Sequence, residues 1–598
     1  MNPAATAAAR VRKVPLGAAE VDIERRADGS ILLRSPQPLS AYPERLTERL
    51  VHWARERPDQ RFLAQRDAAG GWRSLTYAEA LRRVRGIGQS LLDRGLSQER
   101  PLAILSDNDL EHALLALACM HVGIAYVPVS SAYSLVSTDH AKLKHVIGLL
   151  TPGLVYASDG ARFSKAIAAA VPPATEVLLG EQISILESAV PTSAVDAAHA
   201  AIGPDSIAKF LLTSGSTGQP KAVINTQRML CSNQQMLTHS LPSLLETPPV
   251  LVDWLPWNHT AGSNHNLGLV LNHGGTLYID EGKPVPGLIE KTVRNLREIA
   301  PTIYFNVPRG YEALLPFLRE DAALRETFFS RLGLLQYAAA VLPQPIWKAY
   351  EDLAVQTCGE RILWITGYGA TETAPAAMFT SRGAARAGSV GLPVDGIEMK
   401  LVPADDKLEV RFRGPNITPG YWRQPELTRA AFDEEGYYRT GDAMRFVDAA
   451  DPRQGFEFDG RTTEDFKLTT GTWVSVGPLR AKINAACSPL VQDVVVTGHD
   501  RDSLGALVFP NTAICRDLSA AELRARLRPV FQRLALESTG SSTRVARAMV
   551  MEQPPSIDAS EVTDKGSINQ RAVLKNRAAL VEKLYADPPD SSILVASP

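Results

Sequence analysis

Apolar runs alternate with helical patterns over most of the chain. Strand-like runs occur at 101–106, 125–129, 154–157, 207–212, 250–255, 302–307 and 361–365. Helical patterns lie between them, for example at 110–122 and 142–150. Continuous apolar strands separated by helices are typical of parallel sheets that are covered on both faces. The pattern therefore predicts an α/β fold with a large, multilayer, doubly wound body and mostly parallel sheets.

Beyond about residue 460 the elements become shorter and of a different type. Apolar runs at 494–497 and 504–509 flank a polar turn, and a long amphipathic helix is predicted at 518–536. This α+β unit of about 130 residues is large enough for its own core. Because the run 460–465 is polar and without apolar periodicity, we expect a large domain at 1–463, with an N-terminal extension at 1–40, and a lid domain at 464–598. Two unequal domains with a polar joint indicate a mobile lid.

Composition and charge exclude several classes of protein. With 45% hydrophobic and 21% charged residues, the chain is neither disordered nor fibrous. Lys plus Arg is 63 against 65 for Asp plus Glu, and this near balance argues against nucleic acid as a partner. No stretch approaches the ~20 apolar residues of a membrane span, and the N-terminus lacks the apolar segment of a secretory signal. Five cysteines without C-x-x-C spacing indicate free thiols, so we expect a cytoplasmic protein with no membrane partner.

A loop of glycines and hydroxyls is the strongest local signal. Residues 211–221 read LLTSGSTGQPK, and the candidate phosphate-binding residues are Thr213, Ser214, Gly215, Ser216, Thr217, Gly218 and Lys221. Backbone N–H groups, hydroxyls and one ammonium suit a polyphosphate. Pro220 stands where a Walker A loop has glycine, and Ser214 stands at the first glycine of a serine-hydrolase elbow, so neither of those motifs is present. A flexible Ser/Gly turn is the alternative for the loop taken alone.

Five further motifs follow in chain order. They are WLPWNHTAG (254–262), GYGATET (367–373), GPNITPGYW (414–422), YRTGD (438–442) and GR (460–461). This succession resembles the AMP-forming superfamily of acyl- and aryl-CoA synthetases, adenylation domains and luciferases, over roughly residues 45–575. The segments 31–59, 254–275 and 465–480 are similar to feruloyl-CoA synthases in particular.

The resemblance implies a site for ATP with Mg²⁺. The loop would hold the β- and γ-phosphates, and Thr217 and Glu372 would bind Mg²⁺, which prefers hard oxygen ligands. The remaining nucleotide contacts would be Ala339, Tyr368 and Gly369 around the adenine, Asp442 and Arg461 at the ribose, and Thr371. The alternatives are a helix cap for Glu372, core packing for the alanine run 338–340, and a surface ion pair for Asp442 and Arg461.

The resemblance also implies an acid pocket. His259 would act as a gate and a carbonyl contact, and the walls of a slot for a flat conjugated acid would be Trp257, Asn258, Tyr304 and Asn306. A zinc cluster of His259, His265 and His273 is not expected, because no H-E-x-x-H motif or cysteine partner accompanies them.

The lid departs from the family pattern in two places. Relatives usually carry Asp in G-R-x-x-D, where this chain has Glu464 followed by Asp465, so the hinge is expected at these two residues. Most relatives have G-K-hydrophobic-x-R, whereas residues 563–571 read TDKGSINQR. Lys565 is the nearest ammonium and would be the catalytic lysine; a solvated loop lysine is the alternative. After the lid turns, Lys467, Gly471 and Trp473 would face CoA.

These features predict an ATP-dependent acid–thiol ligase that forms an acyl-adenylate, releases pyrophosphate and transfers the acyl group to CoA. Lys565, His259 and Lys467 would be the catalytic residues, and ferulate or a related hydroxycinnamate the acid. The alternatives are an aliphatic acyl-CoA ligase, an adenylation enzyme that loads a carrier protein, and a nucleotide-binding module without turnover. A homodimer stays open.

Overall fold

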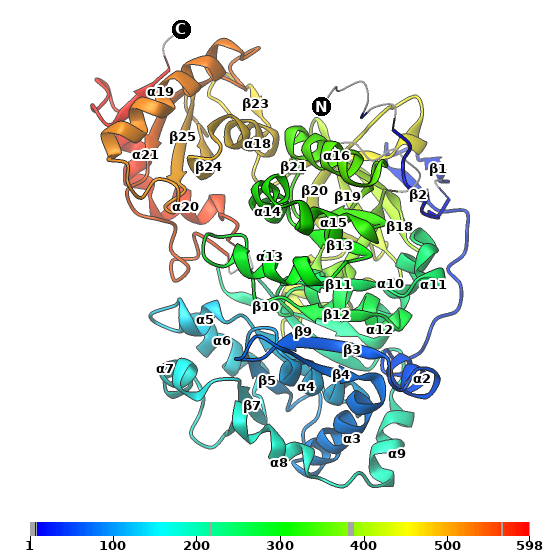
Figure 1. Cartoon of the computed structure of the whole chain (residues 1–598). Helices are drawn as coiled ribbons and strands as arrows, with labels where there is room; N and C mark the ends of the chain where they lie inside the picture. Colours follow the sequence, from blue (N-terminus) through cyan, green and yellow to red (C-terminus); the bar gives the residue numbers. More distant parts are fainter. Residues whose placement is uncertain are drawn as a thin grey trace.

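The computed structural model describes residues 6, 9–18, 20–214, 218–380, 388–563 and 566–596, with only the backbone at Ser214. It has a large layered body and a smaller C-terminal unit, which stands beside one end of the body (Figure 1). The predicted α/β fold with a smaller α+β unit is confirmed. The predicted strands and helices named above are present, apart from shifts at their ends.

One layer of the body is a six-stranded sheet in the order β10-β9-β6-β5-β7-β8 among the described residues. Its strands are β5 (Leu102–Leu105), β6 (Tyr126–Val129), β7 (Leu154–Ala157), β8 (Glu176–Leu179), β9 (Ile207–Ser214) and β10 (Pro220–Thr226). Neighbours are parallel except for the β9–β10 hairpin. Alternate side chains of β5 enter separate cores on the two faces. The helices over these faces are α3 (Tyr77–Asp93), α4 (Leu110–His121), α5 (Ala132–Leu135), α6 (Ala141–Leu150) and α7 (Gly160–Ala170), with α8 (Ile183–Glu187) and α9 (Ser193–Ala201) against α3.

A four-stranded sheet in the order β11-β12-β3-β4 forms a second layer. Its strands are β3 (Arg61–Arg66), β4 (Trp72–Thr76), β11 (Val250–Asp253) and β12 (Thr276–Ile279). Associated helices are α2 (Glu48–Glu56), α10 (Gln227–Ser240), α11 (Ser243–Glu246), α12 (Gly268–His273) and a π-helix at Ala261–Leu267. The π-helix begins at Ala261, within the WLPWNHTAG motif, so the last residues of that motif are helical.

The largest sheet has the order β1-β2-β18-β19-β20-β21-β17-β16-β15-β14-β13 among the described residues. Its strands are β1 (Asp22–Arg25), β2 (Ile31–Arg34), β13 (Ile303–Asn306), β14 (Leu334–Tyr337), β15 (Leu363–Gly369), β16 (Ala376–Phe379), β17 (Ser389–Pro393), β18 (Glu398–Ala404), β19 (Lys407–Arg413), β20 (Tyr438–Phe446) and β21 (Phe456–Arg461). Strands β13, β14 and β15 are parallel and enclose a core with α13 (Ile289–Glu298), α14 (Pro308–Glu320), α15 (Ala322–Ser330) and α16 (Gln344–Cys358). The other neighbours are antiparallel, so this sheet is less parallel than the sequence predicted. The reason is that tight turns, and not crossover helices, connect strands such as β18 and β19.

The N-terminal extension contributes the outer edge of this sheet. Strand β2 pairs antiparallel with β18, and β1 covers β2. The chain then runs down one side of the body to α2 (Figure 1). The extension is therefore part of the sheet and not a free tail over these residues.

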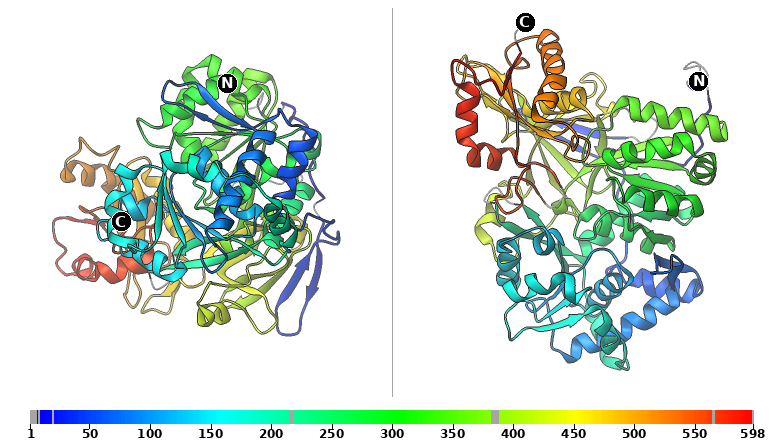
Figure 2. Two further views of the ribbon diagram at one scale, coloured as in Figure 1. Left: turned by 90° about the horizontal axis from the view of Figure 1, so that it is seen from below. Right: turned by 60° about the vertical axis from the view of Figure 1, so that its left-hand side comes forward.

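The C-terminal unit has its own sheet in the order β24-β25-β26-β27 and a small hairpin. Its strands are β22 (Phe466–Lys467), β23 (Trp473–Val474), β24 (Val491–Thr497), β25 (Leu504–Pro510), β26 (Val545–Val550) and β27 (Ile593–Val595). One core involves α18 (Val476–Cys487) and α19 (Ala520–Leu536), and another involves α20 (Gln570–Asn576) and α21 (Ala578–Tyr585). Figure 2 shows this unit, orange to red, with one loop reaching the cyan segment of α5 and α6.

Side-chain caps fix the starts of several helices. Asp109 accepts from His112 N at α4, and Thr226 accepts from Met229 N at α10. Ser519 and Glu522 form a capping box at α19, which satisfies two otherwise unbonded N–H groups. Of the helices within the described parts, none is long and apolar enough to cross a bilayer.

Candidate functional site

The candidate phosphate loop joins β9 and β10, which pair as an antiparallel hairpin. Thr213 faces Lys221 in the register of the two strands. Gly218 has a φ of 82°, a conformation that favours glycine. Residues Gly215, Ser216 and Thr217, and the side chain of Ser214, lie outside the described part of the chain.

Lys221 lies at the start of β10, near the turn of this hairpin. Its Nζ lies 4.0 Å from the ring centroid of Tyr421. Burial lowers the pKa of Lys221. The Glu372 carboxylate raises this pKa, and the Arg461 guanidinium lowers it. The ammonium, the carboxylate and the guanidinium therefore lie within electrostatic reach of one another, although they come from three separate motifs.

Glu372 lies in a 3₁₀ turn at Thr371–Thr373, directly after β15, and is 6% exposed. Tyr421 Oη donates to Glu372 Oε1 at 3.1 Å, and Thr418 N donates to the Glu372 carbonyl at 2.9 Å. The GPNITPGYW segment thus holds both ends of this residue. A buried carboxylate bonded to a phenol, close to β10, fits a hard divalent cation such as Mg²⁺.

Asp442 and Arg461 are direct partners across β20 and β21. Tyr368 Oη donates to Asp442 Oδ2 at 2.6 Å, and Arg461 Nε lies 3.4 Å from Oδ1. Burial raises the pKa of Asp442, against the opposite effects of Arg461 and Tyr368. Among the described residues, Asp442 Oδ1 accepts no hydrogen bond, so it is an open acceptor for a hydroxyl group.

The alanine run 338–340 follows β14. Ala339 and Ala340 are exposed, and Ala339 has a φ of 73°, so these two alanines do not pack in the core. Tyr368 and Gly369 end β15, the next strand of the sheet. Phe412 and Phe458 lie near Tyr368, with ring centroids 6.0 and 6.4 Å away. Phe458, which is 38% exposed, was missed by the sequence reasoning.

The candidate gate lies at the start of the π-helix. Ser263 N and Oγ donate to the His259 carbonyl at 3.0 and 2.9 Å. Lys209 Nζ donates to Ser263 Oγ at 3.1 Å. Asn258 and His259 are partly exposed, whereas Trp257 is buried in the core with its ring centroid 5.2 Å from that of His112.

Two of the predicted pocket walls bond to each other. Asn306 Nδ2 donates to Tyr304 Oη at 2.9 Å, and both side chains are buried. Tyr311 Oη donates to the Tyr304 carbonyl at 2.7 Å. This network holds the end of β13, where Phe305 points to the other side.

A polar pair that the sequence reasoning missed lies beside Phe305. Gln336 Nε2 donates to His265 Nε2 at 3.0 Å, and His265 Nδ1 donates to Asn266 Oδ1 at 2.9 Å. Burial lowers the pKa of His265 to about 4, so the ring is neutral at pH 7. The His265 and Phe305 ring centroids are 4.8 Å apart. Gln336 is 3% exposed, and its Oε1 has no hydrogen-bond partner within the described chain. The signal in the sequence was a glutamine inside the apolar strand LLQY.

The loop before Lys565 rests on the body. Lys142 Nζ donates to the Ile557 carbonyl at 2.6 Å, and Thr138 N and Oγ1 donate to Asp558 Oδ2 at 3.0 and 2.7 Å. Ser560 Oγ donates to the Gly218 carbonyl at 3.1 Å. A segment of the C-terminal unit therefore contacts Gly218, close to the start of β10. Lys565 itself lies outside the described residues.

The expected hinge residues differ in their contacts. Asp465 Oδ2 pairs with Lys407 Nζ at 2.5 Å, with side chains 7% and 5% exposed, and Oδ1 accepts from Val476 N at 2.9 Å. Asp465 thus links Lys407 of the body to the first turn of α18. Glu464 is joined to the body by its backbone, through a bond to the Arg461 carbonyl at 3.1 Å.

The predicted CoA contacts lie on the β22–β23 hairpin. Lys467 and Trp473 face each other, with Nζ 4.7 Å from the ring centroid, and Gly471 has a φ of 79°. Lys467 and Gly471 are exposed. Among the described residues, no hydrogen bond or ion pair joins this hairpin to Thr213, Gly218 or Lys221.

Comparisons with known proteins identify the family of this chain. The family model of AMP-binding enzymes matches residues 50–422, and the model of their C-terminal domain matches residues 465–588. A carboxylic acid reductase of Mycobacterium marinum is 24% identical over 573 residues, which cover 86% of this chain and 46% of the reductase. The chain therefore spans about half the length of that relative.

A feruloyl-CoA synthase of an Amycolatopsis species is 28% identical over 393 residues, which cover 62% of this chain and 71% of the synthase. The solved structure of an anthranilate CoA ligase in complex with anthranoyl-AMP matches with a TM-score of 0.70 at 20% identity. The match covers 91% of this chain and 99% of that one, and it supports the fold. Since the family model covers well over half of the chain, this protein belongs to the family of AMP-binding enzymes.

Proposed function

We propose that this chain is an ATP-dependent, AMP-forming acid–CoA ligase. The observation that carries the proposal is the gathering of Lys221, Glu372, Asp442 and Arg461 from separate motifs around one hairpin tip. The open acceptor on Asp442 suits a ribose hydroxyl, and Lys221 suits a phosphate. Thr217 and Glu372 would hold Mg²⁺, which neutralises phosphate charge when bound.

In the first half-reaction the substrate carboxylate attacks the α-phosphorus and pyrophosphate leaves. The protein positions the two reactants and offsets charge on the phosphate oxygens, with Lys221 and Lys565 as the cations. The contact of Ser560 with Gly218 supports an adenylating arrangement of the lid, because Ser560 shortly precedes Lys565 in the chain.

In the second half-reaction the lid, residues 464–598, turns on the body about Glu464 and Asp465. This motion would bring Lys467, Gly471 and Trp473 to the thiol substrate, with His259 at the gate. The CoA thiol then attacks the adenylate carbonyl and AMP leaves.

The proposed acid is ferulate or a related hydroxycinnamate. The support is the group of Phe305, His265 and Gln336, an aromatic face next to a buried acceptor that lacks a donor. A 4-hydroxyl on the acid could donate to Gln336 Oε1 while its ring packs on Phe305. Leaving a buried acceptor unpaired costs about 1–3 kcal/mol, so an acid without the hydroxyl binds less well.

The test is a panel of acids assayed for AMP and thioester with ATP and Mg²⁺. Ferulate and 4-coumarate should exceed cinnamate in kcat/KM, and octanoate should be poorer still. Gln336→Met should lower kcat/KM for 4-coumarate by ~10-fold and change that for cinnamate less. Equal rates for octanoate and ferulate would refute the aryl assignment and favour the aliphatic alternative.

A second panel varies the thiol. Rapid thioester formation with CoA, compared with pantetheine or no thiol, is expected of a CoA ligase. Adenylate formation with no transfer to either thiol would favour the enzyme that loads a carrier protein. The alignment with a carboxylic acid reductase over 86% of this chain makes that alternative worth the experiment. If AMP is not formed with any acid in the panel, the ligase proposal itself is contradicted.

A further inference from the structure

A hydrogen-bonded chain of serine, histidine and aspartate lies on the body, outside the nucleotide site. Ser40 Oγ lies 2.8 Å from His239 Nε2, and His239 Nδ1 lies 2.7 Å from Asp395 Oδ2. Since a carboxylate only accepts, Nδ1 carries the proton and Nε2 is free to accept from the serine hydroxyl. This is the order of groups that activates a serine nucleophile: hydroxyl, base and orienting carboxylate.

Three separate segments hold these side chains. Ser40 lies on the linker between β2 and α2, His239 in the last turn of α10, and Asp395 in the turn between β17 and β18. The linker packs closely on this turn at Gly396, whose φ is 80°. A Cβ at Gly396 would lie only 2.8 Å from Leu39 Cβ. This close approach brings the linker and the turn together at His239, which contacts both Ser40 and Asp395.

The solvent exposure of the three side chains suits catalysis. Ser40 is exposed, whereas the side chains of His239 and Asp395 are each 18% exposed. A substrate can therefore reach the hydroxyl while the base and its partner stay largely shielded.

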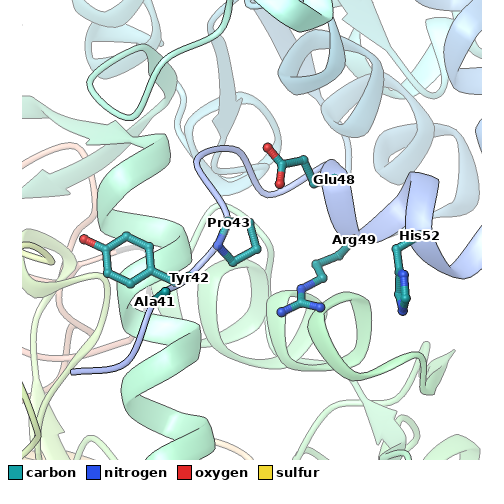
Figure 3. A pocket seen from close by; sticks show the side chains of 6 residues that line it. All are labelled: Ala41, Tyr42, Pro43, Glu48, Arg49 and His52. Carbon is teal, nitrogen blue, oxygen red and sulfur yellow. The ribbon is translucent and has the colours of Figure 1, made fainter. Parts of the chain in front are cut away.

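A pocket of about 330 Å³ begins at the residue after Ser40. It is lined by Ala41, Tyr42, Pro43, Glu48, Arg49 and His52. Figure 3 shows the Arg49 guanidinium extending from α2 toward the linker with Ala41 and Tyr42. Glu48 pairs with Arg45 at 2.7 Å, whereas Arg49 lines the pocket, is partly exposed and has no ion-pair partner among the described residues. The pocket therefore offers a cation to an anionic group.

Backbone donors for an oxyanion lie beside the hydroxyl. Within the described chain, the N–H groups of Ser40 and Ala41 donate no hydrogen bond to protein. Donors next to the nucleophile can stabilise the negative charge that develops on a carbonyl oxygen.

We propose that Ser40, His239 and Asp395 form a second catalytic site, which hydrolyses small carboxylic esters or thioesters that carry an anionic group. Arg49 binds that group. The activity needs neither ATP nor CoA, so it is independent of the ligase proposal.

The reaction has two balanced steps. Ser40 Oγ attacks the acyl carbon and its proton passes to His239 Nε2; the bond to the alcohol or thiol breaks, and that leaving group takes the proton. Water then attacks the acyl-serine ester, passing a proton to Nε2, and the acid leaves as Ser40 Oγ regains a proton. The sum is ester plus water giving acid plus alcohol or thiol, with no redox change.

Covalent labelling tests the nucleophile. An alkyl fluorophosphonate should form a phosphorus–oxygen bond to Ser40 with loss of fluoride. Trypsin releases residues 35–45, a peptide whose hydroxyls include Ser35, Ser40 and Tyr42, and fragmentation should place the label on Ser40. Ser40→Ala should abolish the label, and Ser35→Ala is the matched control that keeps it. His239→Gln should slow labelling at least ~10-fold. Labelling elsewhere, or at a rate that His239→Gln does not change, overturns the proposal.

Turnover tests the substrate class. Without ATP or CoA, the protein should hydrolyse mono-4-nitrophenyl succinate, which carries a carboxylate, faster than neutral 4-nitrophenyl acetate. Arg49→Gln should reduce this preference at least ~10-fold, and Arg49→Lys should retain part of it. Thermal unfolding of each variant shows that it is folded. Equal hydrolysis by wild type and Ser40→Ala, or an equal rate for both esters, overturns the proposal.

Discussion

Replacing Asp558 by asparagine should slow adenylate formation and spare the transfer to CoA. Asp558 accepts from Thr138 N and Oγ1 and so docks the loop before Lys565 onto the body. If docking of this loop is required only for the first half-reaction, weakening it affects that step alone.

The size of the effect follows from the contacts. Hydrogen bonds to a charged group contribute about 1.5–3 kcal/mol. Asparagine keeps one acceptor and Asp558 is partly exposed, so the expected loss is about 1–2 kcal/mol, or ~5–30-fold in the docking equilibrium. Burial acts against ionisation, but bonds from Ser137 and Thr138 hold the pKa of Asp558 below its usual range. The ionised Asp558 therefore contributes fully to docking when the pH is above its free pKa of about 3.9. This contribution is lost as the pH falls through the lowered pKa of the docked carboxyl.

The assay separates the half-reactions. Pyrophosphate exchange measures adenylate formation, and a supplied acyl-adenylate with CoA measures the transfer. Asp590→Asn is the matched control, because Asp590 also accepts from a backbone N–H and a hydroxyl, both of Ser592 within the lid. Equal losses in both half-reactions, or an unchanged exchange rate for Asp558→Asn, would refute the docking argument.

Three further changes test the site. Glu372→Gln keeps the size of the side chain but removes the charge that binds Mg²⁺, so the rate of adenylation should fall at least ~10-fold. The rate is measured as a function of Mg²⁺ concentration, and full activity of the variant at limiting Mg²⁺ would show that Glu372 is not in the site. Tyr368→Phe removes the bond to Asp442 and should weaken AMP binding by ~5-fold or more in calorimetry; unchanged affinity would show that the phenol does not position the carboxylate. Burial lowers the pKa of Lys209 to about 7, against about 10.4 in the unfolded chain. Wild-type stability should therefore rise with pH between these values, and Lys209→Met should raise the unfolding temperature at pH 6 but not above pH 10.5. A difference in unfolding temperature between wild type and Lys209→Met that stays constant from pH 6 to pH 10.5 would contradict the burial argument.

The residues brought together around Lys221 were predictable from sequence because each belongs to a short motif with a chemical signature. Glu372, Asp442 and Arg461 follow such motifs directly. Strands with apolar runs, such as β5 and β7, were likewise predictable because burial on both faces leaves a clear local pattern.

Contacts between distant segments were not predictable in the same way. Gln336 and His265 are 71 residues apart, and Thr138 and Asp558 are 420 apart. Nothing local in either segment encodes its partner. Ser40, His239 and Asp395 come from three such segments, and a lone serine on a linker carries no signal of its own.

The N-terminal hairpin has a consequence for any shortened form of the protein. Strand β1 is exposed along its whole length and carries Asp22, Glu24 and Arg25, which protect the outer edge of the sheet from pairing with another chain. Removing the first 40 residues would uncover the four positions of β18 that pair with β2, Glu398 to Leu401. A second molecule could then add its own strand to that bare edge, so trimming this end for crystallisation would invite linear aggregates that the full sequence avoids.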